Sequence, residues 1–252
     1  MRLLFLVMVR ESEKKTRPDF FKALESAISQ VARPGTEVKI QGLSDIFPDT
    51  SEALYWYAQP RATDELCYLA RKGEKEAYDG VVIGCVGAVE AEYAIKEALN
   101  IPVVGVSESS FLLALLLGVN FSLLTYADKT YAWLYRTVRQ YGLEHKCASI
   151  RQAEIGVKEM LSKGDVAYEK TLEQAQLAIK EDRAEVIVLG SIGYAGMADY
   201  LRKRIDAPVV DPIETGVKFA EIMVDLHKSK GLLQSKVLTY KGSPNVDKFL
   251  RL

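Results

Sequence analysis

The chain has 252 residues, of which 48% are hydrophobic, and a net charge of −1. This length is sufficient for one large domain or two smaller lobes with real cores. The near-zero net charge gives no argument for binding to nucleic acid or to an anionic membrane.

The apolar runs are too short for a membrane span. The most apolar piece, Phe111 to Leu117, falls well below the roughly 20 residues that a bilayer requires. The start of the chain lacks the small-residue cleavage site of a secretory signal. The three cysteines, Cys67, Cys85 and Cys147, form no CxxC pair, which disfavours a disulfide framework or a zinc site. We therefore expect a reduced, cytoplasmic protein with no membrane association.

Apolar runs alternate with helical patterns along the chain. Residues 2–9 are almost continuously apolar, which is typical of a strand buried on both faces of a parallel sheet. The other predicted strands are 37–43, 81–84, 120–125, 147–151, 186–189 and, in the tail, 236–240. The predicted helices include 20–32, 61–77, 129–141, 167–181 and 194–205, and 44–60 is irregular. This alternation predicts an α/β fold with parallel strands, helices on both faces and right-handed crossovers.

Two stretches, 81–118 and 186–224, repeat the same pattern. Each runs from a buried strand through a turn and a helix to a Pro-Val-Val strand, a polar turn and a second helix. Cys85 and Ser191 occupy the same place, each 17 positions before the proline. Agreement of this kind indicates an internal duplication.

The duplication predicts two pseudo-symmetric lobes, one formed by 1–118 plus about 215–252 and the other by 119–214. Ligands of open parallel sheets bind beyond the carboxyl ends of the strands. The turns that contain Cys85 and Ser191 lie at such ends. We therefore expect the active site in the cleft between the lobes.

Cys85 follows a buried strand, precedes a helix and is flanked by Gly84 and Gly87. The field of a helix amino terminus predicts a thiol pKa below its free value of about 8.5. The glycines allow a ligand to approach the backbone, whose N–H groups bind an oxyanion or a carboxylate. The alternative is a small residue buried at a strand end. The matching position of Ser191 favours the functional interpretation.

Ser191 lies in a second glycine-rich turn. Its hydroxyl needs an activating neighbour, and nothing in the sequence places either histidine, His145 or His227, beside it. The alternative is that Ser191 caps the helix predicted over 194–205. The glycine spacing in both turns matches neither GxGxxG nor a Walker loop, which disfavours a nucleotide site.

Further residues complete the predicted site. Arg10 and Thr125, at the ends of the first strands of the two halves, are candidates for binding a carboxylate or carbonyl, although Arg10 is equally consistent with a solvated loop. Glu108 and Glu214 occupy matched places six positions after a proline, and we expect them to orient the neighbouring turn or, with Ser107, to cap the next helix, in preference to a catalytic role. The substrate-binding candidates are Arg10, Gly84, Val86, Gly87, Thr125, Tyr126, Ile192 and Gly193.

These motifs resemble the aspartate/glutamate/hydantoin racemase superfamily, over roughly 80–225. The resemblance rests on Ile-Gly-Cys at 83–85, Pro-Val-Val-Gly-Val, the following Ser-Glu turn and Phe-Ser-Leu-Leu-Thr at 121–125. VIVLG and PVVDP in the second copy look most like the hydantoin racemase branch. The resemblance implies a two-lobed α/β fold, a small-molecule substrate and chemistry without a cofactor. We also expect a homo-oligomer.

The resemblance further implies two cysteines, one per lobe, on opposite sides of an acidic carbon. One removes a proton and the other returns one to the opposite face. Cys85 matches the first cysteine, whereas Ser191 falls where the second belongs and is a poorer proton donor or acceptor. The first turn also differs, because Val9-Arg10-Glu11 stands where the hydantoin branch often has an Asn-Pro-Asn-like motif.

Three functions are compatible with this pattern. The first is a racemase that acts next to the carbonyl or carboxylate of an amino acid or hydantoin, with Cys85 as one base and Ser191 or water as the weaker partner. The second is a one-cysteine decarboxylase or lyase-like enzyme that protonates one face. The third is a ligand-binding protein that has lost activity. The intact pattern around both turns favours the first.

Overall fold

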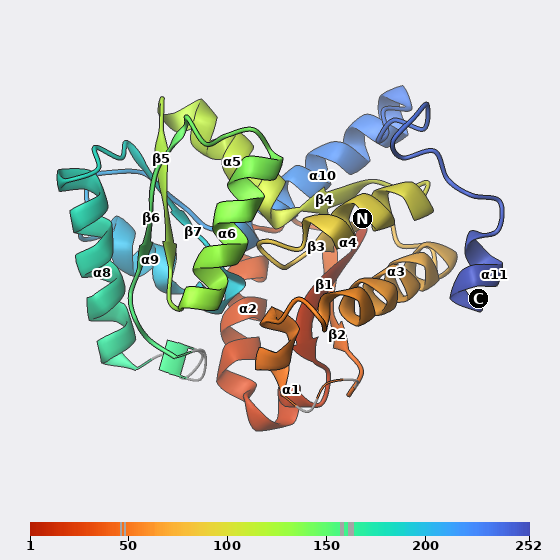
Figure 1. The fold of residues 1–252 in the computed structure, drawn as a ribbon. Coiled ribbons are helices and arrows are strands. Elements are labelled where there is room, and N and C mark those ends of the chain that lie inside the picture. Colours follow the sequence, from red (N-terminus) through yellow and green to blue (C-terminus); the bar gives the residue numbers. More distant parts are fainter. Residues whose placement is uncertain (46, 48, 157–158, 161–163) are drawn as a thin grey trace. The chain divides into compact units, whose positions relative to one another are not determined.

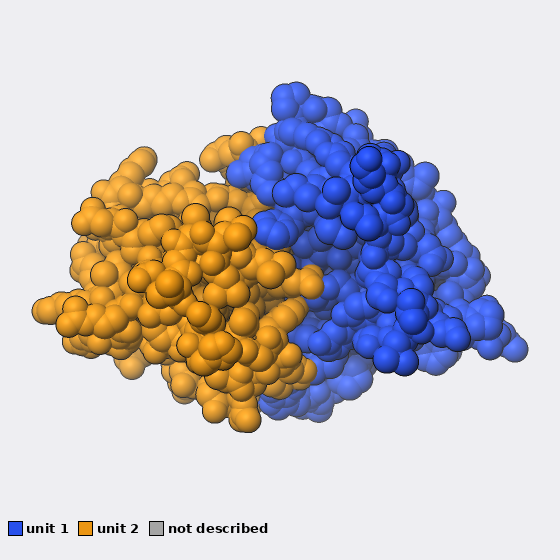
Figure 2. Space-filling model, turned by 90° about the horizontal axis from the view of Figure 1, so that it is seen from above, with its two compact units in different colours: residues 1–13, 31–105, 216–252 blue, residues 14–30, 106–215 orange. Residues whose placement is uncertain are grey.

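The computed structural model describes all residues except 46, 48, 157–158 and 161–163 (Figure 1). The chain forms two compact units, which Figure 2 colours blue and orange. Unit 1 contains residues 1–13, 31–105 and 216–252, and unit 2 contains residues 14–30 and 106–215.

Unit 1 is built on a parallel sheet with the strand order β2-β1-β3-β4. The strands are β1 (Arg2–Arg10), β2 (Glu37–Leu43), β3 (Gly80–Ile83) and β4 (Val103–Gly105). The helices with most or all of their residues in this unit are η1 (Thr50–Leu54), α3 (Gln59–Lys75), α4 (Val89–Ala98), α10 (Pro212–Lys230) and α11 (Val246–Leu250). Residues 3–9 of β1 are buried, as expected for a strand covered on both faces.

Unit 2 is built on a parallel sheet with the strand order β6-β5-β7-β8. Its strands are β5 (Phe121–Thr125), β6 (Cys147–Gln152), β7 (Val186–Leu189) and β8 (Val209–Val210). Its helices include α2 (Pro18–Val31), α5 (Val106–Leu117), α6 (Asp128–Gln140), α8 (Asp165–Lys180), η2 (Ile192–Tyr194) and α9 (Met197–Arg202). The short helix α1 (Glu13–Thr16) joins β1 to α2. The stacked rings of Phe111 and Phe121, 5.3 Å apart, join α5 to β5 in the core.

The two sheets confirm the predicted parallel α/β fold. In unit 1 Leu6 pairs with Ile83, and in unit 2 Leu124 pairs with Leu189, so these strands align residue for residue. The predicted boundary between the lobes at residue 118 was based on the sequence duplication, whereas the two units are defined by compactness. The compact units place α2 and α5 in unit 2. The boundary at residue 118 therefore remains a prediction.

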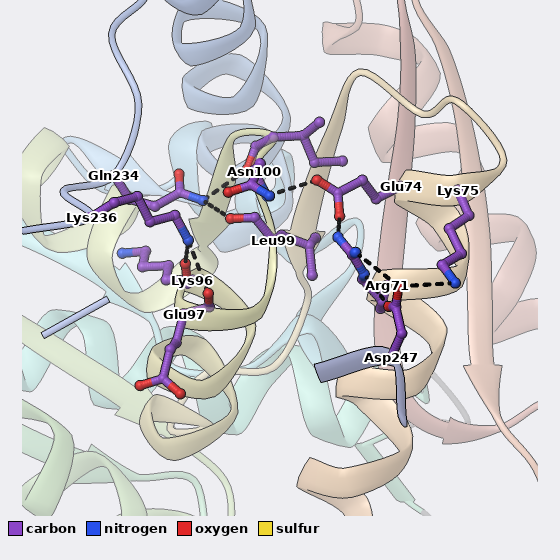
Figure 3. Close-up of polar contacts among 11 residues, drawn as sticks. Arg71, Glu74, Lys75, Lys96, Glu97, Leu99, Asn100, Gln234, Lys236 and Asp247 are labelled. Carbon is purple, nitrogen blue, oxygen red and sulfur yellow. Dashed lines mark hydrogen bonds and ion pairs between the residues drawn. The ribbon is translucent and has the colours of Figure 1, made fainter. Parts of the chain in front are cut away.

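Three segments differ from the sequence predictions. The stretch 44–60, expected to be irregular, contains the short 3-10 helix η1. Residues 236–240 form turns and no strand, and Val237 and Leu238 in this segment are 85% and 83% exposed. The tail is held by side-chain hydrogen bonds: the Lys236 ammonium donates to the carbonyls of Lys96 and Glu97 at the end of α4 (Figure 3). The helix expected over 194–205 is divided into η2 and α9, because Gly196 adopts a left-handed conformation with φ +83°.

The glycine that ends β7 has no room for a side chain. A Cβ at Gly190 would lie 2.5 Å from a methyl carbon of Leu134 and 2.6 Å from the carbonyl oxygen of Leu124. We expect Gly190→Ala to lower the free energy of unfolding by about 1–3 kcal/mol through overpacking, measured by urea denaturation. Gly164→Ala is the matched control, because no heavy atom lies within 4 Å of its added Cβ. Equal losses in the two variants would contradict the steric explanation.

Candidate active site

Cys85 lies in the turn that joins β3 to α4. Its neighbour Gly84 donates a backbone hydrogen bond to the carbonyl of Leu6 at 2.7 Å, which fixes the start of the turn against β1. Gly87 adopts φ +98°, and the Ala88 N–H bonds the Cys85 carbonyl at 3.3 Å. The half-buried thiol therefore lies at the carboxyl end of a central parallel strand, as predicted.

The protonation state of Cys85 differs from the prediction. Burial raises the pKa of the Cys85 thiol to about 12, whereas the sequence predicted a pKa below the free value. The reason is that α4 begins only at Val89, beyond the turn, and a helix dipole acts mainly within its first turn. No charged group in the described part of the chain offsets the desolvation. The resting side chain is therefore a neutral thiol at neutral pH.

Ser191 lies at the equivalent place in unit 2. Gly190 donates a backbone hydrogen bond to the carbonyl of Leu124 at 2.8 Å, as Gly84 does to Leu6. The Ser191 Oγ accepts the N–H of Gly193 at 3.0 Å, so it caps η2 and not the longer helix expected. The same oxygen lies 3.3 Å from the Tyr126 hydroxyl. Two of the predicted site residues, Ser191 and Tyr126, are thus brought together.

A second tyrosine supports this hydroxyl pair. Tyr194 is fully buried, and its ring meets the Tyr126 ring edge-on with the centroids 5.8 Å apart. Burial raises the pKa of Tyr194, so its hydroxyl stays protonated. No signal in the sequence distinguishes Tyr194, because a tyrosine between two glycine-containing turns carries no chemical signature.

Arg10 and Thr125, two other predicted residues, are engaged by neighbours. The Arg10 Nε donates to Glu13 at 3.0 Å, and one terminal nitrogen donates to the carbonyl of Phe47 at 3.1 Å. The buried Thr125 hydroxyl donates to Thr130 at 2.5 Å, next to the start of α6. Both therefore shape the ends of their strands, and their contact with a substrate remains a prediction.

Unit 2 also contains a buried carboxyl group that the sequence analysis did not select. Asp211 follows β8, and its Oδ1 accepts the N–H of Ile213 at 2.7 Å, which caps α10. Burial, and then the charge of Glu214, raise its pKa to about 7. The sequence does contain a signal for this capping role, because Asp211 directly precedes Pro212, a proline at the first position of a helix.

Glu214 has the orienting role that its position suggested. Both of its carboxylate oxygens accept hydrogen bonds from Arg202, at 2.7 and 2.8 Å, and Arg202 also donates to the carbonyl of Val209. This bidentate pair links α10 to α9 and β8. Asp211 and Glu214 line a pocket of about 210 Å³ within unit 2.

Across the described ranges, no group of three His, Cys, Asp or Glu side chains is arranged to hold a metal ion. None of the helices in those ranges has the length and apolar content needed to cross a membrane.

Comparisons with known proteins identify the family of the chain. The profile of the family described as Asp/Glu/Hydantoin racemase matches residues 15–220. A hydantoin racemase of Pseudomonas sp. (strain NS671) is 34% identical over 222 residues, which cover 87% of this chain and 85% of that protein. A hydantoin racemase of Paenarthrobacter aurescens is 31% identical over 87% of this chain and 90% of that protein.

Solved structures show the same similarity. The allantoin racemase of Pseudomonas fluorescens superposes with a TM-score of 0.80 at 31% identity, over 97% of each chain. Arylmalonate decarboxylase superposes with a TM-score of 0.61 at 17% identity, over 92% of this chain and 94% of that one, and shares the fold.

The raised pKa of Cys85 predicts slow alkylation. At pH 7.5 we expect iodoacetamide to modify Cys85 more slowly than a free cysteine, because only the thiolate reacts. The rate should increase about tenfold per pH unit up to the highest pH at which the chain stays folded. Peptide mass spectrometry measures this rate, with the Cys85→Ala variant to identify the peptide. A rate that levels off below pH 8 would show that the thiol pKa is lowered after all.

The raised pKa of Asp211 predicts a pH-dependent stability. Its folded value of about 7 lies above the unfolded value of about 3.9. Between about pH 3.9 and pH 7 the folded protein therefore holds a proton on Asp211 that the unfolded chain has lost. The stabilisation from this proton is present at low pH and is lost as the pH rises towards 7. Compared with Asp211→Asn, which keeps the cap, the wild type should lose on the order of 2 kcal/mol between pH 5 and pH 8.

Urea unfolding at the two pH values measures this difference. Asp199→Asn is the control, because Asp199 is an exposed carboxylate of the same pocket. Parallel stability profiles for the wild type and Asp211→Asn would contradict the prediction.

Proposed function

The chain belongs to the Asp/Glu/hydantoin racemase family, and from this premise we propose that it is a cofactor-independent racemase of cyclic ureides of the hydantoin type. The relatives at 31–34% identity are named hydantoin racemases, and the structural neighbour at 31% identity is an allantoin racemase. Hydantoin and allantoin share a five-membered ureide ring with an acidic carbon next to a carbonyl group. The acidic carbon of this ring is the proposed site of proton exchange.

One observation carries the proposal: Cys85 and Ser191 follow equivalent glycines in the two copies of the fold. A racemase needs a proton-transferring group for each face of its stereogenic carbon. The duplication supplies one such group from each copy. We infer that Cys85 and Ser191 act on opposite faces of one substrate.

In the proposed reaction a Cys85 thiolate takes the proton from the acidic carbon. The electron pair left on that carbon delocalises into the neighbouring carbonyl as an enolate, which the backbone N–H groups of the turns at Val86 and Ile192 stabilise. A proton then reaches the opposite face of the carbon from the Ser191 hydroxyl. The adjacent Tyr126 hydroxyl, 3.3 Å away, resupplies that proton. Water then returns a proton to Tyr126 and accepts the one held by Cys85, which restores the starting state.

Because the resting Cys85 is a neutral thiol, the first step requires its ionisation. The base is more abundant at higher pH, so we expect the rate of proton removal to increase with pH across the neutral range. In the reverse direction the neutral thiol is the competent proton donor.

A second function is favoured by the chemical difference between the two positions. Only one of the equivalent residues is a thiol, and a decarboxylase that protonates one face needs a single acid. The neutral Cys85 thiol fits that task. Release of carbon dioxide from an arylmalonate would support this second function.

The direct test follows an enantiopure 5-substituted hydantoin in deuterated water. The racemase proposal predicts exchange of the hydrogen on the stereogenic carbon, observed by proton NMR, together with loss of optical rotation. Cys85→Ala should lower both rates at least about 100-fold, because a positioned acid–base group contributes 10²–10⁴. Cys147→Ala is the matched thiol control and should retain activity.

Variants at Ser191 separate the two proposed functions. Ser191→Cys should raise racemisation, and Ser191→Ala should lower racemisation more than exchange, because one face can still be deprotonated and reprotonated by Cys85. If neither variant changes the ratio of racemisation to exchange, Ser191 is not the second group. Absence of exchange with every hydantoin and amino acid, in a folded wild type, would exclude the racemase proposal.

A further inference from the structure

Unit 1 contains a pocket of about 560 Å³ that the proposed reaction does not use. Three helices line it: α3, α4 and the short C-terminal helix α11. Its volume lies within the range of small-molecule sites, which is about 300–1,000 Å³.

The pocket exists because small side chains face each other across it. Ala94 and Ala98 line it from α4, and Thr63 and Cys67 line it from α3. Because these side chains are small, they do not fill the volume between the two helices, which larger side chains would occupy. Phe249, which is 78% exposed, adds an aromatic ring from α11, so most of the lining surface is apolar.

Ion pairs hold the third wall in place (Figure 3). The Asp247 carboxylate of α11 accepts from the Arg71 Nε at 2.8 Å and lies 3.2 Å from the Lys75 ammonium. Arg71 also pairs with Glu74 on its own helix. These contacts fix α11 against the side of α3, and the tail that precedes α11 is anchored on α4 through Lys236.

The charged groups that line the pocket are all acidic. Asp64, Glu90 and Glu97 contribute carboxylates, and no lysine or arginine is among the described lining residues. Asp64 and Glu97 make no ion pair or side-chain hydrogen bond with the part of the chain that the structure describes. Figure 3 shows the Glu97 carboxylate extending away from the Lys236 ammonium, which bonds backbone carbonyls instead.

Both carboxylates act on the interior of the pocket. Burial and then the charges of Asp64 and Glu97 raise the pKa of the Cys67 thiol, which lines the same pocket. The field there disfavours an anion, and the apolar walls disfavour a small hydrated ion. Trp56, 46% exposed, adds an indole face, the aromatic surface that cations prefer.

We propose that this pocket binds a small organic cation with an apolar body, in the class of aryl-alkylammonium ions. The apolar body packs between α3, α4 and Phe249. The ammonium group lies near Asp64 and Glu97, two exposed carboxylates that form no ion pair with the described residues.

The test compares three probes of the same shape and different charge: 4-phenylbutylammonium, 4-phenylbutanol and 4-phenylbutyrate. Isothermal titration calorimetry on the full chain measures their affinities. The ammonium should bind about fivefold more tightly than the alcohol, the gain expected from two exposed ion pairs, and the carboxylate should bind most weakly. Equal affinities for ammonium and alcohol, or no binding of any probe, would overturn the proposal.

Two variants locate the site. Asp64→Asn/Glu97→Gln changes only exposed side chains and should remove the preference for the ammonium while leaving the affinity of the alcohol unchanged. Phe249→Ala should weaken all three probes alike, because it removes apolar contact area without removing charge. Glu37→Gln, an exposed carboxylate elsewhere in unit 1, is the matched control. A loss of ammonium preference in Glu37→Gln equal to that in the double variant would show non-specific surface attraction and would overturn the proposal.

Discussion

The candidate site depends on one steric constraint, which occurs twice. Gly84 and Gly190 each end a central strand, and each donates a hydrogen bond to the strand beside it. A Cβ at either position would meet the backbone oxygen that accepts this bond, at 2.9 Å from Leu6 and 2.6 Å from Leu124. Only glycine avoids this clash and lets the strand remain hydrogen-bonded to its neighbour up to Gly84 or Gly190. The chain then turns directly after the glycine. The next residue, Cys85 or Ser191, is therefore held at the carboxyl end of its sheet.

Burial determines the electrostatic state of these turns. It raises the pKa values of the Cys85 thiol, the Tyr194 hydroxyl and the Asp211 carboxyl group, and for each of them desolvation is the largest cause. Cys85 and Tyr194 are consequently neutral in the resting protein at neutral pH. In the proposed reaction, such surroundings would screen the charge that develops on the substrate weakly, so this charge would interact strongly with nearby backbone dipoles.

The sequence predicted the features that repeat and missed those that depend on single contacts. The alternation of strands and helices was sufficient to predict the parallel sheets, because strand and helix periods are encoded locally. The matched spacing from Cys85 and Ser191 to the Pro-Val-Val strands was sufficient to predict the two equivalent turns. The tail could not be predicted in the same way. Its apolar Val237 and Leu238 suggested a strand, but the segment is held by Lys236 on the carbonyls of α4. The pKa of Cys85 was misjudged because the distance to the helix start and the burial of the thiol are three-dimensional properties.

Each copy of the fold contains a buried carboxyl group, but different elements of the two copies supply it. In unit 1, Glu92 of α4 is buried and pairs with Lys96 at 2.7 Å, and its carboxylate fills the place that a side chain on Gly105 would need. The register of β3–β4 and β7–β8 makes Asp211 the equivalent of Gly105.

The same alignment makes Ala198 the equivalent of Glu92, and Ala198 and Asp211 line one pocket. Each copy thus keeps one carboxyl group beside the end of its last strand, supplied by the helix in unit 1 and by the strand end in unit 2. An aspartate at position 105 would collide with Glu92, whereas the small Ala198 leaves room for Asp211. These positions are therefore coupled by volume and charge. The duplicated fold thus places the Cys85 thiol in the copy whose helix supplies the carboxyl group. It places the Ser191 and Tyr126 hydroxyls in the copy whose strand end supplies it.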